Sequence, residues 1–180
     1  LRHNRKLLIS PTASGKSLMI YALVRYYMDR NEKILVVVPT TSLVSQLYGD
    51  FRDYGLDVES CCHQIYSGKE KTNEYPITIT TWQSIYKLER SFFEDYNVII
   101  GDEAHLFKSK SLIEIMTKLH HAKYRFGFTG TLDDTQTHKL VLEGLFGAVR
   151  RVTQTADLIE QGHLSQFLIK CIVLKYGDEY

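Results

Sequence analysis

The sequence is poor in cysteine, and its three cysteines are badly spaced for cross-linking or for binding a metal. Cys61 and Cys62 are neighbours, and Cys171 lies far along the chain. Neighbouring cysteines do not easily bridge each other, and the sequence contains no C-x-x-C pair. We therefore expect reduced thiols of the intracellular kind, and the sequence argues against a disulfide framework or a zinc site.

Long apolar runs and a signal peptide are also missing. No run approaches the roughly 20 residues that a membrane-spanning helix needs. The 22 basic and 21 acidic residues leave a net charge of +1. This balance argues against a protein that binds nucleic acid only through a large excess of basic residues. A protein that grips a strand with backbone amides and helix ends is still compatible with this balance. We expect a cytoplasmic protein with no membrane partner.

The 180 residues have ordinary apolar and charged fractions, which predicts one globular domain with a real core over residues 1–180. There are no internal repeats and no low-complexity segments. The chain begins at Leu1 rather than Met and stops at Tyr180 in charged, unpatterned sequence. We therefore expect it to be a piece of a longer protein.

A phosphate-binding loop is the first motif along the chain. It follows the apolar run Leu7–Ile9, precedes an apolar helical pattern, and consists of Pro11, Thr12, Ala13, Ser14, Gly15, Lys16 and Ser17. Backbone N–H groups at a helix N-terminus favour an anion, Gly15 lets the backbone approach phosphates, Lys16 supplies a positive charge, and the Ser17 hydroxyl can ligate Mg²⁺. Ser10 stands where the pattern has glycine. A plain Ser/Gly turn with a solvated lysine is the alternative.

Two adjacent acids, Asp102 and Glu103, follow the apolar run Val98–Ile100. An acid at the tip of a strand beside a phosphate loop is well placed to hold Mg²⁺, and a second carboxylate can orient or deprotonate the attacking water. We therefore assign Asp102 to the metal and Glu103 to the role of general base. The alternative is a pair of solvated acids at the end of a strand.

Strands and helices alternate along the whole chain. Strands are expected at 6–9, 34–38, 58–65, 77–80, 97–100, 124–128 and 167–174, with helical patterns between most of them. This alternation predicts an α/β fold, with a mostly parallel sheet and helices on both faces. Right-handed crossovers bring the carboxyl ends of the strands to one edge, where ligands bind in open α/β sheets.

Within the helices, the expected inward positions are Leu18, Ala22 and Leu23 in the first, and Leu140, Val141 and Leu145 near the end. Ser111 and Glu114 have the spacing of a capping box. These assignments fix which face of each helix should meet the sheet.

Several further polar clusters follow strands and should lie at the same edge. His105 can pair with a group across the site, and Thr129, Gly130 and Thr131 can bond the acidic turn, although an ordinary histidine and a plain polar turn are the alternatives. Small hydroxyl and amide groups at helix N-termini suit the phosphates of a nucleic-acid backbone. The candidates for that contact are Pro39, Thr40, Thr41, Thr80, Thr81, Trp82 and Gln83. Trp82 is also compatible with a place in the core.

These segments together resemble a known family. The stretches 11–17, 38–43, 80–84, 102–105 and 128–132 are similar, in order and spacing, to motifs I, Ia, Ib, II (in its D-E-A-H form) and III of superfamily 2 helicases. Thr129-Gly130-Thr131 departs from the commoner S-A-T or T-A-T form of motif III. The chain looks most like the phage UvsW-type DNA helicases, and residues 155–164 resemble the segment that closes the first domain of that group.

The resemblance implies a RecA-like P-loop NTPase domain, the first of two in an ATP-dependent DNA helicase that uses ATP and Mg²⁺. Such motors act on branched DNA in replication, recombination and repair. The second RecA-like domain and its arginine finger are not visible in this sequence, and an adenine-reading segment would precede Leu1. Since a missing arginine finger can cost orders of magnitude in rate, we expect the chain alone to hydrolyse ATP hardly at all.

Other functions remain open at this point. The same motor could act on RNA, or serve as the translocase subunit of a restriction enzyme. A nucleotide-dependent clamp that binds nucleic acid without unwinding it belongs to a different class, which the intact acid pair disfavours.

Overall fold

The computed structural model describes residues 4–11, 14–72, 74–106, 109–131, 136–165 and 172. Within these residues the core is a seven-stranded sheet in the order β3-β4-β2-β5-β6-β1-β7, and every pair of neighbouring strands is parallel. The strands are β1 (Arg5–Ile9), β2 (Ile34–Val38), β3 (Cys62–Ile65), β4 (Ile77–Thr81), β5 (Val98–Gly101), β6 (Tyr124–Thr129) and β7 (Val149–Arg151). The predicted α/β fold with a parallel sheet is confirmed.

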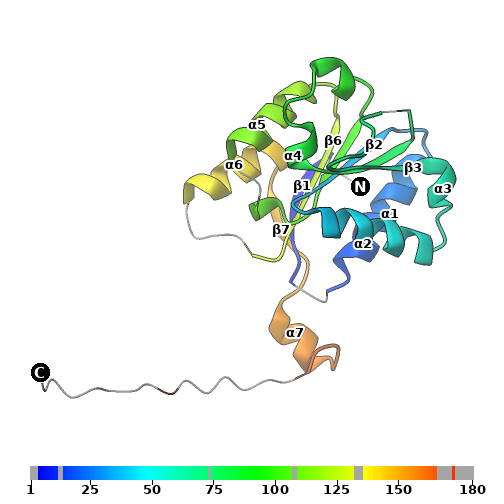
Figure 1. Cartoon of the computed structure of the whole chain (residues 1–180). Helices are drawn as coiled ribbons and strands as arrows, with labels where there is room; N and C mark the ends of the chain where they lie inside the picture. Colours follow the sequence, from blue (N-terminus) through cyan, green and yellow to red (C-terminus); the bar gives the residue numbers. More distant parts are fainter. Residues whose placement is uncertain are drawn as a thin grey trace, which may run out of the picture.

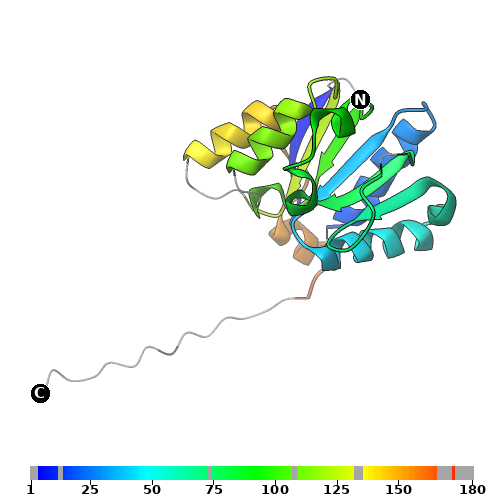
Figure 2. The same cartoon turned by 45° about the horizontal axis from the view of Figure 1, so that its top comes forward.

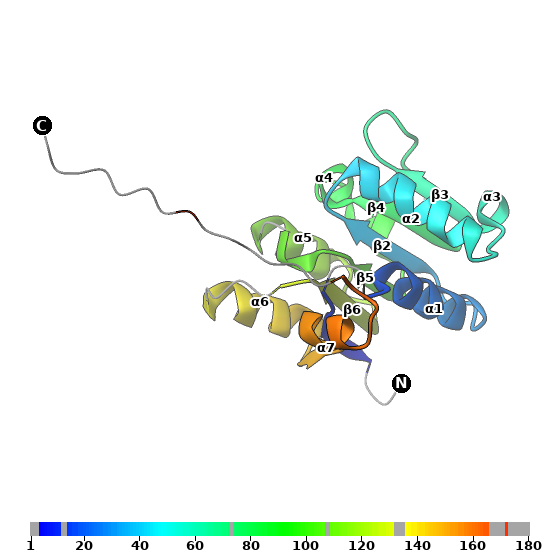
Figure 3. The same cartoon turned by 90° about the horizontal axis from the view of Figure 1, so that it is seen from below.

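Helices cover both faces of this sheet. They are α1 (Lys16–Met28), α2 (Thr41–Asp53), α3 (Val58–Cys61), α4 (Trp82–Ile85), α5 (Ser109–Lys118) and α6 (Gln136–Phe146), with short 3-10 helices at Arg90–Phe93 and Ala104–Leu106. The last helix, α7 (Thr155–Glu160), lies below these layers in Figure 1. Helices α1 to α3 lie on one face and α4 to α6 on the other (Figures 1 and 3). Figure 2 shows the same two layers, with α5 and α6 in green and yellow opposite α2 in cyan.

The two faces have separate hydrophobic cores because the central strands are apolar on both sides. All five residues of β2 are buried, and alternate side chains go to opposite layers. Val36 packs with Ile20, Val24 and Phe51 from α1 and α2, whereas Val37 packs in the other core with residues of α5 and α6. The sheet is thus packed on both faces, and the loops at its carboxyl edge are attached to well-packed strands.

Two of the predicted helix faces are only partly right: Leu23 of α1 and Leu145 of α6 are half-buried and pack against the cores, but other predicted positions are exposed. In α1 the buried residues are Ile20, Val24 and Tyr27, whereas Leu18 is 53% exposed and Ala22 is also exposed. In α6 the buried residues are Leu142 and Phe146, and Leu140 is 67% exposed. The buried residues of α1 recur at i, i+4 and i+7, and Lys16, one turn before Ile20, lies on the same face and reaches the acidic turn after β5.

Local structure corrects three more predictions. Residues 58–61 form the short helix α3, because the Ser60 hydroxyl donates to the Asp57 side chain and backbone and turns the chain before β3. Ser111 lies inside α5, so it does not cap that helix. Strand β7 was not expected. The predicted strand 167–174 lies outside the described residues except at position 172, which is in no strand.

Cys61 and Cys62 form no disulfide within the described residues, and Cys171 lies outside them. The longest helices of the described part, α1 and α2, have 13 residues each. None of the helices described there is long and apolar enough to cross a bilayer.

Two glycines with left-handed backbones give a first testable prediction. Gly55 (φ 89°) and Gly147 (φ 97°) both follow helices, but a Cβ on Gly147 would lie 2.9 Å from Arg5 Cβ and 3.0 Å from Arg5 O, whereas one on Gly55 would meet nothing. We expect Gly147→Ala to cost about 1–3 kcal/mol more unfolding free energy than Gly55→Ala, which carries only the backbone strain. Urea denaturation of both variants measures this difference, and equal losses would contradict it.

Candidate nucleotide and metal site

The predicted phosphate loop connects β1 to α1 at the carboxyl edge of the sheet. Ser10 is fully buried, its N–H donates to Thr129 O at 2.9 Å, and its hydroxyl lies 2.5 Å from that of Ser14. The Ser14 hydroxyl also lies 2.5 Å from Pro11 O, while Thr12 and Ala13 are outside the described residues. The serine that replaces glycine at the start of the motif therefore closes the base of the loop with its side chain.

Gly15 ends the loop in a left-handed conformation (φ 81°) and is the N-cap of α1. Glycine adopts this conformation without steric cost, and an exposed helix N-terminus follows directly. The N-terminus of α1 therefore directly follows the loop, and the binding of an anion there stays a prediction.

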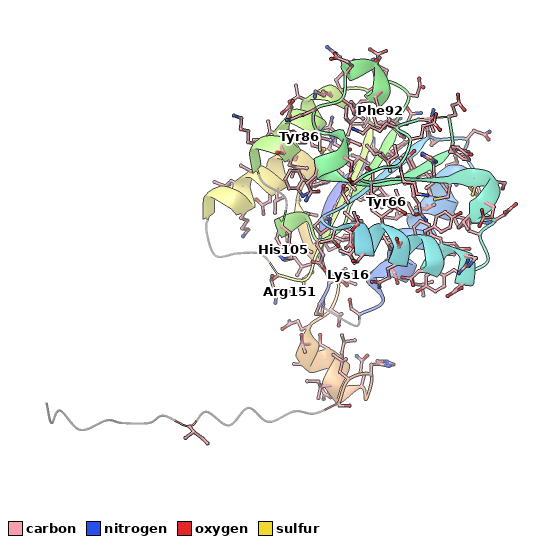
Figure 4. All side chains as sticks on the ribbon, viewed as in Figure 1. Lys16, Tyr66, Tyr86, Phe92, His105 and Arg151 are labelled. Carbon is pink, nitrogen blue, oxygen red and sulfur yellow. The ribbon has the colours of Figure 1, made fainter. Side chains whose placement is uncertain are left out.

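Lys16 forms an ion pair with Glu103, which lies in the turn after β5. The two side chains are only 14% and 21% exposed, and His105 Nδ1 lies 3.4 Å from the other oxygen of Glu103. Figure 4 shows Lys16 and His105 at the same edge of the sheet. The structure thus brings the first and fourth predicted motifs into direct contact.

Asp102 is the more buried of the two acids, with 6% of its surface exposed. Its Oδ1 accepts the Glu103 N–H at 2.9 Å, and its own N–H donates to Val37 O of β2 at 2.9 Å. Burial raises the pKa of the Asp102 carboxyl, and the nearby Lys16 ammonium opposes part of that shift. A positive charge beside Asp102 therefore stabilises its ionised form.

Glu103 has a left-handed backbone (φ 47°), which is uncommon for a residue with a side chain. Such strained positions persist where the surrounding structure fixes them, and they cluster at functional sites. Here the bonds of Asp102 to β2 and to the Glu103 amide fix the turn. The conformation directs the Glu103 side chain to Lys16.

The segment after β6 also reaches this site. His105 Nδ1 lies 2.6 Å from the hydroxyl of the buried Thr129, and that hydroxyl lies 2.5 Å from Thr131 O. A Cβ on Gly130 would be 3.9 Å from Lys16 Nζ and 3.8 Å from Ser10 O. The turn 129–131 therefore touches both the phosphate loop and the acidic turn, the arrangement expected of a coupling segment.

The donor set fits a magnesium ion that is bound together with a nucleotide. Among the described residues there is no group of three or more His, Cys, Asp or Glu that could hold a metal by itself. Mg²⁺ in nucleotide sites takes one or two carboxylates and completes its shell with phosphate oxygens and water. Asp102 and Ser17 supply protein ligands of this type, and Lys16 offers a charge to the phosphates.

The candidate nucleic-acid residues lie at the carboxyl ends of the neighbouring strands β2 and β4, but most of them are not in loops as predicted. Thr41 begins α2, Thr80 and Thr81 end β4, and Trp82 and Gln83 begin α4. Thr40 caps α2 by accepting the Leu43 N–H at 3.3 Å, Thr41 is exposed, and Gln83 donates to the carbonyl of the buried Pro39 at 3.1 Å. Thr80 and Thr81 are buried, and the Thr81 hydroxyl bonds Ser84 at 2.8 Å. Trp82 packs partly into the core beside Tyr86. Nucleic-acid contact at these positions stays a prediction.

The sequence reasoning missed Tyr54, which lies at the C-terminal end of α2. Its hydroxyl is 3.0 Å from the hydroxyl of Ser17, the predicted metal ligand. The two residues are 37 positions apart, and no motif links them. Only the packing of α1 against α2 brings them together, so sequence spacing offered no signal for this contact.

Comparison with known proteins agrees with this geometry. A family model described as "Type III restriction enzyme, res subunit" matches residues 1–134. The chain is 35% identical over its whole length to "ATP-dependent DNA helicase uvsW" of Enterobacteria phage T4, of which it covers 37%. A crystal structure of the UvsW helicase from bacteriophage T4 superposes with a TM-score of 0.74 at 34% identity, over 82% of this chain and 54% of that one.

A more distant structure shares the fold alone. It is a SWI2/SNF2 ATPase core from Sulfolobus solfataricus in complex with double-stranded DNA, with a TM-score of 0.62 at 19% identity. The superposition covers 79% of this chain and 31% of the SWI2/SNF2 chain. The sheet and its helices are therefore a RecA-like fold, and the chain corresponds to only part of each of these relatives.

Proposed function

We propose that this chain, which belongs to the family of the type III restriction enzyme res subunit, is the first motor domain of an ATP-dependent DNA helicase. The observation that carries the proposal is the contact of Lys16 with Glu103, supported by the 35% identity to a phage protein named as such a helicase. A lysine at a phosphate loop and a carboxylate after the buried strand β5 are two parts that nucleotide hydrolysis requires.

Each residue has a definite role in this proposal. Lys16 binds the β- and γ-phosphates, Ser17 and Asp102 hold Mg²⁺, and Glu103 takes a proton from the attacking water. Mg²⁺, when bound, neutralises the negative charge that develops on the phosphate oxygens. His105, Thr129, Gly130 and Thr131 transmit the state of the acidic turn.

The chemistry of the DNA contact follows from these two strand ends at the same edge. The amides at the starts of α2 and α4, with the exposed hydroxyl of Thr41, suit the phosphates of one strand. A second RecA-like domain of the full-length protein supplies the arginine finger. Branched DNA in replication, recombination and repair is the proposed substrate.

The test is ATP hydrolysis by the full-length protein with single-stranded DNA, with RNA of equal length, and with neither. We expect stimulation by DNA, and a rate at least about tenfold lower in Lys16→Ala, because a charge-assisted bond to phosphate is lost. Stimulation by RNA alone would favour the RNA helicase instead. If the full-length protein hydrolyses ATP but does not displace a strand from a DNA duplex, a restriction translocase or a clamp would be favoured. DNA-stimulated hydrolysis that persists in Lys16→Ala would overturn the assignment of this site.

A further inference from the structure

Tyr54 is placed to support the metal ligand from outside the known motifs. Its hydroxyl lies 3.0 Å from Ser17 Oγ, and either oxygen can be the donor. The side chain comes from α2, whereas Ser17 is in the first turn of α1. Ser17 is part of the site assigned above, but Tyr54 has no role in it so far.

The position of Tyr54 is fixed by a second tyrosine of α1. Tyr21 lies one helical turn after Ser17, and its hydroxyl donates to Tyr54 O at 2.7 Å. The Tyr21 ring also packs between the rings of Tyr54 and Phe51, at centroid distances of 5.2 and 5.9 Å, and Phe51 is fully buried. The ring of Tyr54 is therefore anchored beside Ser17, although 37% of its surface is exposed.

The chemistry of a hydroxyl explains what this contact does. A serine hydroxyl has one proton to donate and two lone pairs to share. A cation takes a lone pair, and it makes the remaining O–H a stronger donor that needs an acceptor. Tyr54 Oη is such an acceptor for the Ser17 proton, and this direction of donation leaves both Ser17 lone pairs for other partners.

We propose that Tyr54 is a positioning residue of the metal site, whose hydroxyl accepts the Ser17 proton and so strengthens the binding of Mg²⁺ with the nucleotide. The inference rests on the proposed function, since it takes Ser17 to be a magnesium ligand. Tyr54 touches neither the phosphates nor the attacking water in this role. It acts only through Ser17.

The test is ADP binding by the full-length protein, measured by calorimetry with Mg²⁺ and again with EDTA. The tested variant, Tyr54→Phe, keeps the ring and the backbone carbonyl that Tyr21 binds, and it removes only the hydroxyl. We expect the gain in affinity on adding Mg²⁺ to fall about 2- to 10-fold, which is the net worth of one hydrogen bond. Affinity in EDTA should be unchanged.

Three controls make the result decisive. Tyr26→Phe changes a partly exposed tyrosine of α1, whose ring contacts Arg30, and it should behave as the wild type. In a Ser17→Ala background, Tyr54→Phe should have no further effect. Lys16→Ala should weaken ADP binding with and without Mg²⁺, and failure of that result counts against the proposed function rather than against Tyr54.

The inference is overturned by any of three outcomes. One is a magnesium gain in Tyr54→Phe equal to that of the wild type. Another is an equal loss of affinity with Mg²⁺ and with EDTA, since a merely structural role would act in both. The third is an added loss from Tyr54→Phe when Ser17 is already alanine. Circular dichroism of each variant confirms that the fold is retained.

Discussion

Replacing Glu103 by glutamine is expected to lower kcat for ATP hydrolysis about 10²- to 10⁴-fold in the full-length protein, because glutamine is close in size but cannot accept a proton from water. Nucleotide binding should survive. Glu103 is paired with Lys16, so the substitution removes this ion pair and leaves the lysine charge for the phosphates. The expected signature is a large loss of kcat with a dissociation constant for ATP that is unchanged or lower.

Phosphate release under saturating ATP measures kcat, and calorimetry measures the dissociation constant. Glu114→Gln is the matched control, since Glu114 lies on α5 with 44% of its side chain exposed and pairs only with Lys118 among the contacts described. It should hydrolyse ATP at the wild-type rate. A Glu103→Gln variant that keeps kcat within about threefold of the wild type would remove Glu103 from the chemistry.

The sequence predicts well those parts of the fold whose residue pattern is compatible with only one type of secondary structure. Ile34–Val38 and Val98–Ile100 are continuous apolar runs, and only a strand covered on both faces suits them. The phases of α1 and α6 were predicted only in part, because apolar residues occur all round these helices. In α1 Ile20, Val24 and Tyr27 fill the core, and Leu18 is left exposed to solvent.

The same limit applies to the site. The phosphate loop and the acid pair were predicted because each is contiguous in sequence and carries its own chemistry. The contact between Ser17 and Tyr54, and the left-handed backbone of Glu103, depend on packing between distant segments. The burial of Thr80 likewise follows from its place in β4, which lies between β2 and β3, and a polar residue type does not reveal this.

Replacing Asp102 by asparagine should have two opposite effects, and together they are diagnostic. Hydrolysis should fall by at least about 10²-fold, since a metal ligand that contributes several kcal/mol to the transition state is lost. The free energy of unfolding of the metal-free chain should instead rise by about 0.5–2 kcal/mol at pH 7.5, because the buried carboxylate no longer has to be ionised. The asparagine oxygen can still accept the Glu103 N–H.

The pH dependence of stability gives the sign of this effect independently. Burial raises the pKa of Asp102 in the folded chain above the unfolded value of about 3.9, so the folded state binds the proton more tightly. The free energy of unfolding of the wild type therefore falls as the pH rises through the raised pKa of Asp102. The variant has no carboxyl at this position and does not show this fall.

Urea denaturation in EDTA should give similar unfolding free energies for the wild type and Asp102→Asn at about pH 4. At pH 7.5 the variant should have the higher unfolding free energy. Asp53→Asn, whose side chain is 75% exposed, is the control and should follow the wild type at both. A wild type that is more stable than Asp102→Asn at pH 7.5 would mean that Lys16 compensates the buried charge fully. The site would then be stabilised by its charges rather than strained by them.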